Sequence, residues 1–340
     1  MTREILGIVW FALVGVLLAG YAIFDGFDLG IGTLYPFLGK SEADKTVMRT
    51  AVGPVWDGNE VWLLTGGGAL FAAFPNVYAT VFSGFYLALM LVLWALIFRA
   101  VSFEFRAHDS AWAGVWDWAF FLGSALPALL FGVAVGNIVR GVPLTQGGEF
   151  AGTFFTLLNP YALVLGVLGL TMFLAQGASW LALKASGDLY ARTTKLRSTL
   201  DWVFIAMVVV ATVATFFLAP KGFANVIGWW GGWLFVVLLL VSLVWGRIAM
   251  GGGKDLAAWY AMSLSAASLV GLWAASIFPA LVPAIHDQSR SLTITNSASS
   301  QLTLTVMLII ALIGVPLVLV YFFLIYRSFA GKITVGGDGY

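Results

Sequence analysis

Long apolar stretches, separated by short polar segments, run through the whole chain. A helix needs about 20 mostly apolar residues to cross a bilayer, and nine stretches approach this length. They are residues 5–24, 58–74, 77–98, 115–138, 161–183, 202–218, 226–245, 257–281 and 304–326. The sixth stretch is short, and the first can continue toward residue 37. This pattern predicts an all-α integral membrane protein with about nine transmembrane helices.

Composition narrows the class further. Of the 340 residues, 61% are hydrophobic and only 10% are charged, which excludes a water-soluble domain of this size. A membrane β-barrel would show short alternating segments instead of long apolar runs. The net charge of +1 gives no sign of a nucleic-acid or acidic partner. The chain has no cysteine, so it forms no disulfide and supplies no thiolate for catalysis or for an iron–sulfur cluster.

Lysine and arginine are unevenly distributed over the segments between the predicted helices. Of the 17 basic residues, 13 lie in the odd-numbered connections and the C-terminal tail, whereas four lie at the N-terminus and in the even-numbered connections. Cytoplasmic segments carry the excess of lysine and arginine in membrane proteins. The distribution therefore predicts an N-terminus outside and a C-terminus in the cytoplasm.

This topology brings several ionisable residues of the first four helices to the cytoplasmic face. They are Asp25, Asp28, Asp57, Glu60, Asp117 and Arg99. Asp25 and Asp28 share one side of a helix, because residues three apart on a helix face the same way. Ionisable groups at membrane depth usually face a bundle interior or a water-filled cavity and often serve ion or proton movement. The pattern therefore predicts a proton entrance that opens to the cytoplasm.

Other interpretations fit the same residues. Asp57 and Asp117 can cap or electrostatically favour the starts of their helices, and Arg99 can neutralise an acid for structural reasons. Buried acids on glycine-rich helices are also typical of a stand-alone proton-coupled transporter, although transporter sites lie near the midplane rather than at one face. A chain that only serves as a structural scaffold would carry these residues too, and sequence alone does not separate it from a proton path.

Histidine is scarce. The two histidines, His108 and His286, fall in connections on opposite sides of the predicted membrane. Membrane haems are usually held by histidine or methionine on helices. The eight methionines remain open as ligands, but without a histidine inside a predicted helix we expect no haem or metal to be held by this chain.

Several motifs carry a resemblance to a known family. They include "AGYAIFDGFDLGIGTLYPFLG", "GPVWDGNEVWLLTGGG", "LIFRAVSFEFR" and "WDWAFFLGSALPALLFG". With them the chain resembles subunit II of the cytochrome bd quinol oxidases over nearly its whole length, least between about residues 198 and 253.

The resemblance implies a subunit of an electrogenic terminal oxidase in the prokaryotic cytoplasmic membrane, which oxidises quinol and reduces oxygen to water. The expected partner, subunit I, holds two b haems and haem d, while this chain holds no redox centre. Small single-helix subunits can join the complex, and subunit II can shelter a structural quinone or lipid. The implied fold is one membrane domain with two four-helix bundles, over residues 5–140 and 155–283, and a peripheral helix over 304–327.

The resemblance also suggests residue roles. Asp57 in "WDGN" matches the family's proton-path aspartate, and Trp62 matches a position associated with the path between the subunits. We place Trp56 and Asn59, which flank Asp57, at the same subunit interface or channel lining. The further residues expected on the proton path are Asp25, Asp28, Arg99 and Asp117, with Glu60 as a weaker case because a neutral residue can occupy its position.

Overall fold

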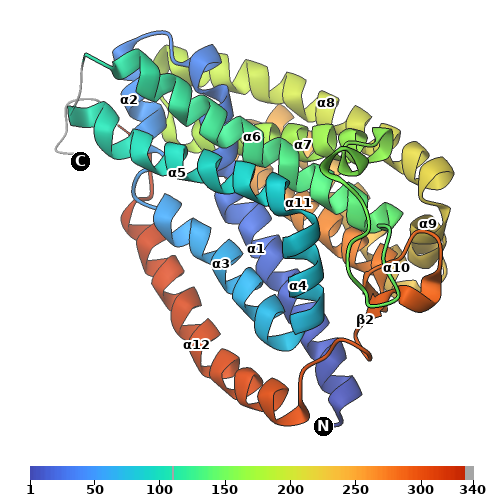
Figure 1. Ribbon diagram of the computed structural model, residues 1–340. Coiled ribbons are helices and arrows are strands. Elements are labelled where there is room, and N and C mark those ends of the chain that lie inside the picture. The colour runs from blue at the N-terminus through green and yellow to red at the C-terminus, as the bar shows by residue number, and fades with distance from the viewer. Residues whose placement is uncertain (109–110, 334–340) are drawn as a thin grey trace.

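The chain folds into a bundle of long helices, here described by a computed structural model for residues 1–108 and 111–333 (Figure 1). The α-helices are α1 (Arg3–Leu38), α2 (Glu42–Thr50), α3 (Trp56–Ala73), α4 (Pro75–Gly84), α5 (Tyr86–His108), α6 (Ala113–Arg140), α7 (Pro160–Lys184), α8 (Gly187–Leu218), α9 (Pro220–Ile227), α10 (Trp230–Gly251), α11 (Asp255–Ile277) and α12 (Gln301–Ser328). The remaining elements are two 3-10 turns, η1 (Phe154–Leu157) and η2 (Gln288–Arg290), and an antiparallel pair of strands, β1 (Ala280–Val282) and β2 (Leu292–Thr293).

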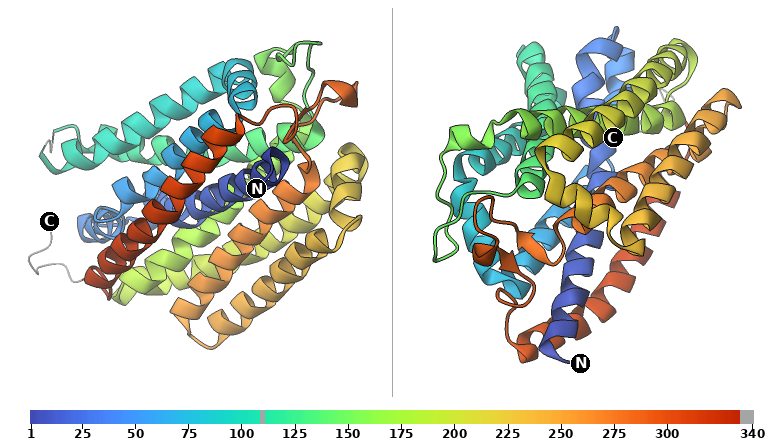
Figure 2. Two further views of the ribbon diagram at one scale, coloured as in Figure 1. Left: turned by 90° about the horizontal axis from the view of Figure 1, so that it is seen from below. Right: turned by 90° about the vertical axis from the view of Figure 1, so that its right-hand side faces the viewer.

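Helix α1 lies at the centre of this arrangement. It packs against α3, α6, α7 and α11, while α5 packs on α6, α8 on α7, and α10 on α11. Helix α12 runs along α1 and α3 at the periphery of the bundle, where few of its residues are buried (Figures 1 and 2). The N-terminus lies at the end of the bundle opposite to α2. The prediction of an all-α membrane protein is therefore confirmed at the level of class.

Eight helices in the described part of the chain are long and apolar enough to cross a membrane: α1, α5, α6, α7, α8, α10, α11 and α12. Helix α3, whose first two turns contain Asp57, Asn59 and Glu60, is not among the helices that are long and apolar enough to cross a membrane. The predicted span over residues 77–98 is wrong in its bounds, because the helix is interrupted at Phe85, between α4 and α5. Gly84 lets Phe150 approach this break closely: a Cβ on Gly84 would lie 2.6 Å from Cβ of Phe150.

Three other predicted boundaries are corrected. The polar segment before residue 202 continues α8 back to Gly187, where Arg197 and Asp201 find partners on neighbouring helices. Helix α10 begins at Trp230 rather than at residue 226, because the short α9 precedes it. Helix α11 ends at Ile277, shortly before Pro279, since a residue that precedes proline disfavours the helical conformation.

Polar residues define several helix starts. Ser41 and Asp44 form a reciprocal capping box at the start of α2. The Ser300 hydroxyl accepts a hydrogen bond from the Thr303 amide, 3.1 Å away, at the start of α12. The hydroxyl-rich segment before this helix therefore caps it.

Helices α1 and α7 approach each other at Gly30 and Gly177. A Cβ on Gly30 would overlap the Phe173 carbonyl oxygen and lie 2.8 Å from the Gly177 nitrogen. We expect Gly30→Ala to lower the free energy of unfolding by about 1–3 kcal/mol, because the two backbones must separate. Thermal denaturation of the purified protein measures this loss. Gly15→Ala, on the same helix but with no atom within 4 Å of its Cβ, is the matched control; equal effects of both variants would contradict the argument.

Candidate functional site

A buried ion pair joins α5 to α1. Arg99 donates two parallel hydrogen bonds to the Asp25 carboxylate, from Nη1 to Oδ2 at 3.0 Å and from Nη2 to Oδ1 at 2.5 Å. Both side chains are completely buried. Two parallel bonds match the planar guanidinium to the carboxylate and fix the geometry of both groups. This ion pair thereby ties α1 to α5 inside the helix bundle.

Two further carboxylates face the same guanidinium. Asp28, one helical turn after Asp25, places Oδ2 3.8 Å from Nη2 of Arg99 and is also fully buried. Glu60 of α3 places Oε1 3.7 Å from Nη1, with 23% of its side chain exposed. One positive charge therefore faces three carboxyl groups, which we call the Arg99 cluster: Asp25, Asp28, Glu60 and Arg99.

Asn59 links this cluster to the peripheral helix. Its amide nitrogen donates to Asp28 Oδ2 at 2.7 Å and to the carbonyl of Phe24 at 3.2 Å. Its Oδ1 accepts a hydrogen bond from the Tyr326 hydroxyl at 2.8 Å. These partners determine the orientation of the amide, since a flipped amide would turn its oxygen toward two acceptors. The residues Asp28, Asn59 and Tyr326 therefore form a continuous polar chain through α1, α3 and α12.

Asp57 does not join the Arg99 cluster. It lies in the first turn of α3 and is exposed in the isolated chain. The capping residue of α3 is Val55, which makes no side-chain cap, so Asp57 is not an N-cap. Trp56 stacks on Phe103 with ring centres 5.5 Å apart. Trp62 is buried and stacks on Phe24 at the same centroid distance.

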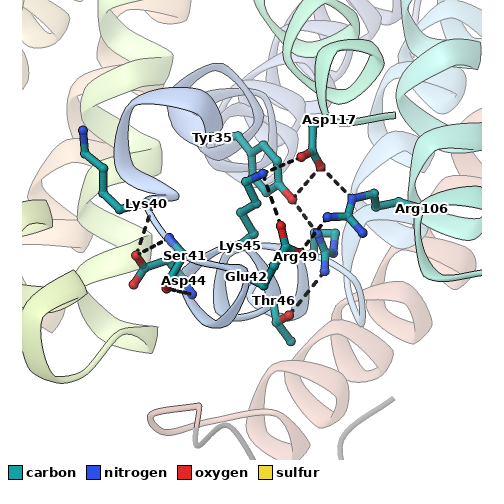
Figure 3. A network of polar contacts seen from close by, with 10 residues as sticks. All are labelled: Tyr35, Lys40, Ser41, Glu42, Asp44, Lys45, Thr46, Arg49, Arg106 and Asp117. Carbon is teal, nitrogen blue, oxygen red and sulfur yellow. Dashed lines mark hydrogen bonds and ion pairs between the residues drawn. The ribbon is translucent and has the colours of Figure 1, made fainter. Parts of the chain in front are cut away.

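Asp117 belongs to a second polar network, at the end of the bundle where α2 lies (Figure 3). Its carboxylate accepts hydrogen bonds from Lys45 Nζ at 2.7 Å, from Arg106 Nε at 2.8 Å and from the Tyr35 hydroxyl at 3.0 Å. Lys45 and Arg106 also reach Glu42. The hydrogen bond to Asp117 raises the pKa of the Lys45 amine above its ordinary value. This network holds α2 against α1, α5 and α6.

The predicted group of five acids thus divides. Three of them meet Arg99, Asp117 is paired elsewhere, and Asp57 faces outward. Sequence reasoning missed Tyr326 and the partners of Asp117. Arg106 carried a usable signal, because it follows Arg99 by seven residues and so lies on the same face of one helix. Tyr326 gave no signal in the sequence, because it lies 267 residues away from its partner Asn59 along the chain.

The two histidines of this chain are exposed and lie outside the core of the helix bundle. His108 is exposed at the last position of α5, where its Nδ1 lies 2.9 Å from the Glu104 carbonyl. His286 is exposed in the loop between β1 and η2. In residues 1–108 and 111–333, no three side chains of histidine, cysteine, aspartate or glutamate are grouped as metal ligands would be.

These features define a class: a multi-pass helical membrane protein with ionisable groups buried inside its helix bundle. The family model for cytochrome bd terminal oxidase subunit II matches residues 6–329. The chain is 37% identical to cytochrome bd-I ubiquinol oxidase subunit 2 of Escherichia coli (strain K12), with 97% of this chain and 96% of the relative covered. It is 40% identical to a probable cytochrome oxidase subunit 2 of Haemophilus influenzae, with the same coverage.

A third relative, cytochrome bd ubiquinol oxidase subunit 2 of Bacillus subtilis, is 33% identical over 91% of both chains. The solved structure of bd oxidase from Geobacillus thermodenitrificans shares the fold, with a TM-score of 0.77 over 97% of this chain and 99% of that chain at 18% identity. The chain belongs to the cytochrome bd terminal oxidase subunit II family.

Membership in this family makes the chain a subunit of a quinol:oxygen oxidoreductase of the bd type. The complex contains haems, and subunit I is the partner of this chain. The bacterial relatives imply the bacterial inner membrane as its location. The interpretation as a stand-alone transporter is thereby replaced.

Proposed function

We propose that this subunit supplies a proton-uptake path from the cytoplasm to the oxygen-reducing haems of subunit I. The observation that carries the proposal is the charge balance of the Arg99 cluster. Asp25, Asp28 and Arg99 are completely buried, and Glu60 is the third carboxyl group within 4 Å of a single guanidinium. Uncompensated charge in a buried site is costly, so bound protons are needed to balance it. A site that must hold protons beside a cytoplasmic surface is suited to passing them on.

The membrane arrangement proposed with this path has nine spans, in which α3 crosses as the second and α4 with α5 form the third. The excess of lysine and arginine on alternate connections supports an outer N-terminus and a cytoplasmic C-terminus. We further propose two four-helix bundles, over residues 5–140 and 155–283, and a peripheral helix over 304–327. The Arg99 cluster then lies toward the cytoplasmic side, as does the Asp117 network.

The exposed face of α3 supports a role for Asp57 at the subunit interface. Val61, Leu64 and Phe71 follow Asp57 at helical spacing and are 44%, 72% and 58% exposed. Gly68 lies on the same face, with no atom within 4 Å of a Cβ built on it. Exposed apolar residues around a carboxylate fit a partner protein better than lipid, because lipid cannot satisfy the charge. Subunit I would therefore cover Asp57, with Trp56, Asn59 and Trp62 behind it.

The proposed mechanism separates charge without a pump. Two b haems and haem d, held by subunit I, would supply the electron transfer from quinol to oxygen, and this chain would hold none of them. Quinol oxidation releases protons outside, and oxygen reduction draws protons from the cytoplasm through Asp57 and the Arg99 cluster. Moving one charge across 100 mV requires about 2.3 kcal/mol, which the redox reaction supplies.

An apolar cavity of about 610 Å³ lies inside the bundle, lined mainly by α1, α6, α7, α8, α10 and α11, with a few residues from α3, α4 and α9. Its lining is almost entirely aliphatic and aromatic. A cavity of this size and character fits a lipid chain or an isoprenoid quinone tail. We propose that such a molecule is a structural component and not the substrate. We also propose that small single-helix subunits are additional partners in the membrane.

Asp57→Asn tests the proton path. We expect oxygen consumption by the complete oxidase to fall several-fold, because the amide cannot carry a proton. The reduced-minus-oxidised spectrum should keep its b and d haem bands. Asp188→Asn, an exposed aspartate in the first turn of α8, is the matched control and should leave turnover unchanged. Normal turnover in Asp57→Asn would favour the second candidate function, a scaffold that only stabilises subunit I.

A further inference from the structure

A small cavity lies at the end of the bundle where α12 and α7 finish. Its volume is about 60 Å³, and it is partly open to the surface. A buried water molecule needs roughly 10–15 Å³ of such space and two or more polar partners. The cavity offers this volume, and Thr50, Lys184 and Tyr326 are the polar side chains in its otherwise apolar lining. Its lining comes from the end of α2 and the connection to α3, from α7, and from the end of α12 with the segment after it: Thr50, Ala51, Pro54, Val55, Trp180, Lys184, Tyr326, Phe329 and Ile333.

The chain beyond α12 covers this cavity and is fastened to the end of α7. Lys184 donates from its buried amine to the Phe329 carbonyl. The Ile333 amide donates to the Lys184 carbonyl at 2.8 Å, and Lys332 donates to the Ala185 carbonyl at 2.7 Å. These bonds hold residues 329–333 as a strap over the cavity, and none of them involves a residue of the Arg99 cluster.

Tyr326 lies between the cavity and the Arg99 cluster. It lines the cavity, and its hydroxyl donates to Asn59, which in turn donates to Asp28. Among the residues that the structure describes, Asp28 Oδ1 has no hydrogen-bond partner although the side chain is completely buried. A buried carboxylate oxygen without a partner is a position for a proton or a water molecule.

We infer that this cavity is the cytoplasmic mouth of the path to Asp28 and that Tyr326 is the positioning residue at its inner end. The inference rests on the proton path proposed above and adds its point of entrance. Water in the cavity reaches the Tyr326 side chain. The Tyr326 hydroxyl holds Asn59 in place, and Asn59 binds Asp28 Oδ2. Asp28 Oδ1 is then left to accept a proton. The charged groups that the structure describes around this passage are Lys184 and Lys332 on the cavity side and Asp25, Asp28, Glu60 and Arg99 on the inner side.

Tyr326→Phe in the assembled oxidase tests the inference, because it removes the hydroxyl and keeps the ring that packs on Phe24 and Trp180. We expect turnover to fall roughly tenfold, which is less than the hundredfold or more lost with a proton-transfer group itself, because Tyr326 only positions Asn59. Proton delivery should then limit the rate, so turnover should decline with rising pH in proportion to the proton concentration over a range where the native oxidase is nearly flat. Haem bands should be unchanged. Tyr321→Phe, on the same helix but 54% exposed, is the matched control.

A second variant tests the cavity without touching Tyr326. Thr50→Leu places a larger apolar side chain in the half-buried lining and should produce the same pH-dependent slowing. If both variants have native turnover and a native pH profile, the inference that this cavity is the entrance is wrong. If Asp28→Asn is nevertheless slow in the same assay, the proposed proton path itself stands. Native turnover in Asp28→Asn as well would instead overturn the proposed function.

Discussion

Replacing Arg99 with methionine should prevent stable assembly of the oxidase. Of the cations in the residues described by the structure, Arg99 is the only one that contacts Asp25 and Asp28, which are both fully buried. Removing one partner of a buried ion pair typically destabilises a protein by about 3–5 kcal/mol, because the remaining charge stays without compensation. We expect little haem-containing complex in detergent extracts and a much lower unfolding temperature for the protein that remains.

Two further variants make this prediction specific. Arg99→Met combined with Asp25→Asn should recover part of the lost stability, since one buried negative charge is also removed. Arg290→Met breaks an exposed pair with Asp287, whose closest atoms are 3.2 Å apart, and should leave the stability nearly unchanged. If Arg99→Met were as stable as Arg290→Met, the ion pairs of the Arg99 cluster would not hold the bundle together.

Asp28→Asn should slow oxygen reduction more than any other single substitution in this subunit that leaves the oxidase assembled. The amide keeps the shape of the side chain and can still accept a hydrogen bond from Asn59. In the native chain this bond runs from Asn59 Nδ2 to Asp28 Oδ2 at 2.7 Å. It cannot take up a proton on Oδ1. We expect turnover to fall about a hundredfold, the loss commonly seen when a proton-transfer group is removed. Oxygen consumption with excess quinol measures the rate, and the haem spectrum reports assembly.

The control for this variant is another buried aspartate. Asp201→Asn removes a carboxylate that is 5% exposed and paired with Arg247, outside the Arg99 cluster. It should leave turnover close to native. Equal slowing in both variants would mean that loss of a buried charge disturbs the whole subunit, and the special role of Asp28 would then be wrong.

Part of the candidate site could be predicted from the sequence. Asp25 and Asp28 lie three apart on one helix, and the structure brings both to Arg99. The same spacing was misleading in α3: Asp57 and Glu60 are also three apart, yet Glu60 reaches Arg99 and Asp57 is exposed. Helical spacing determines which residues are neighbours on a helix, but not which side of the helix faces the core.

The sequence by itself determined the features that depend on local pattern: apolar helices long enough to span a bilayer, the bias of basic residues and, through long motifs, the family. Only the tertiary structure decided which charges meet. The break at Phe85, the pairing of Asp117 with Lys45 and Arg106, and the bond from Tyr326 to Asn59 all depend on helix rotation and close packing between distant segments. Hydrophobic burial drives helices into the membrane regardless of these contacts, whereas a hydrogen bond forms only when two side chains come within about 3 Å.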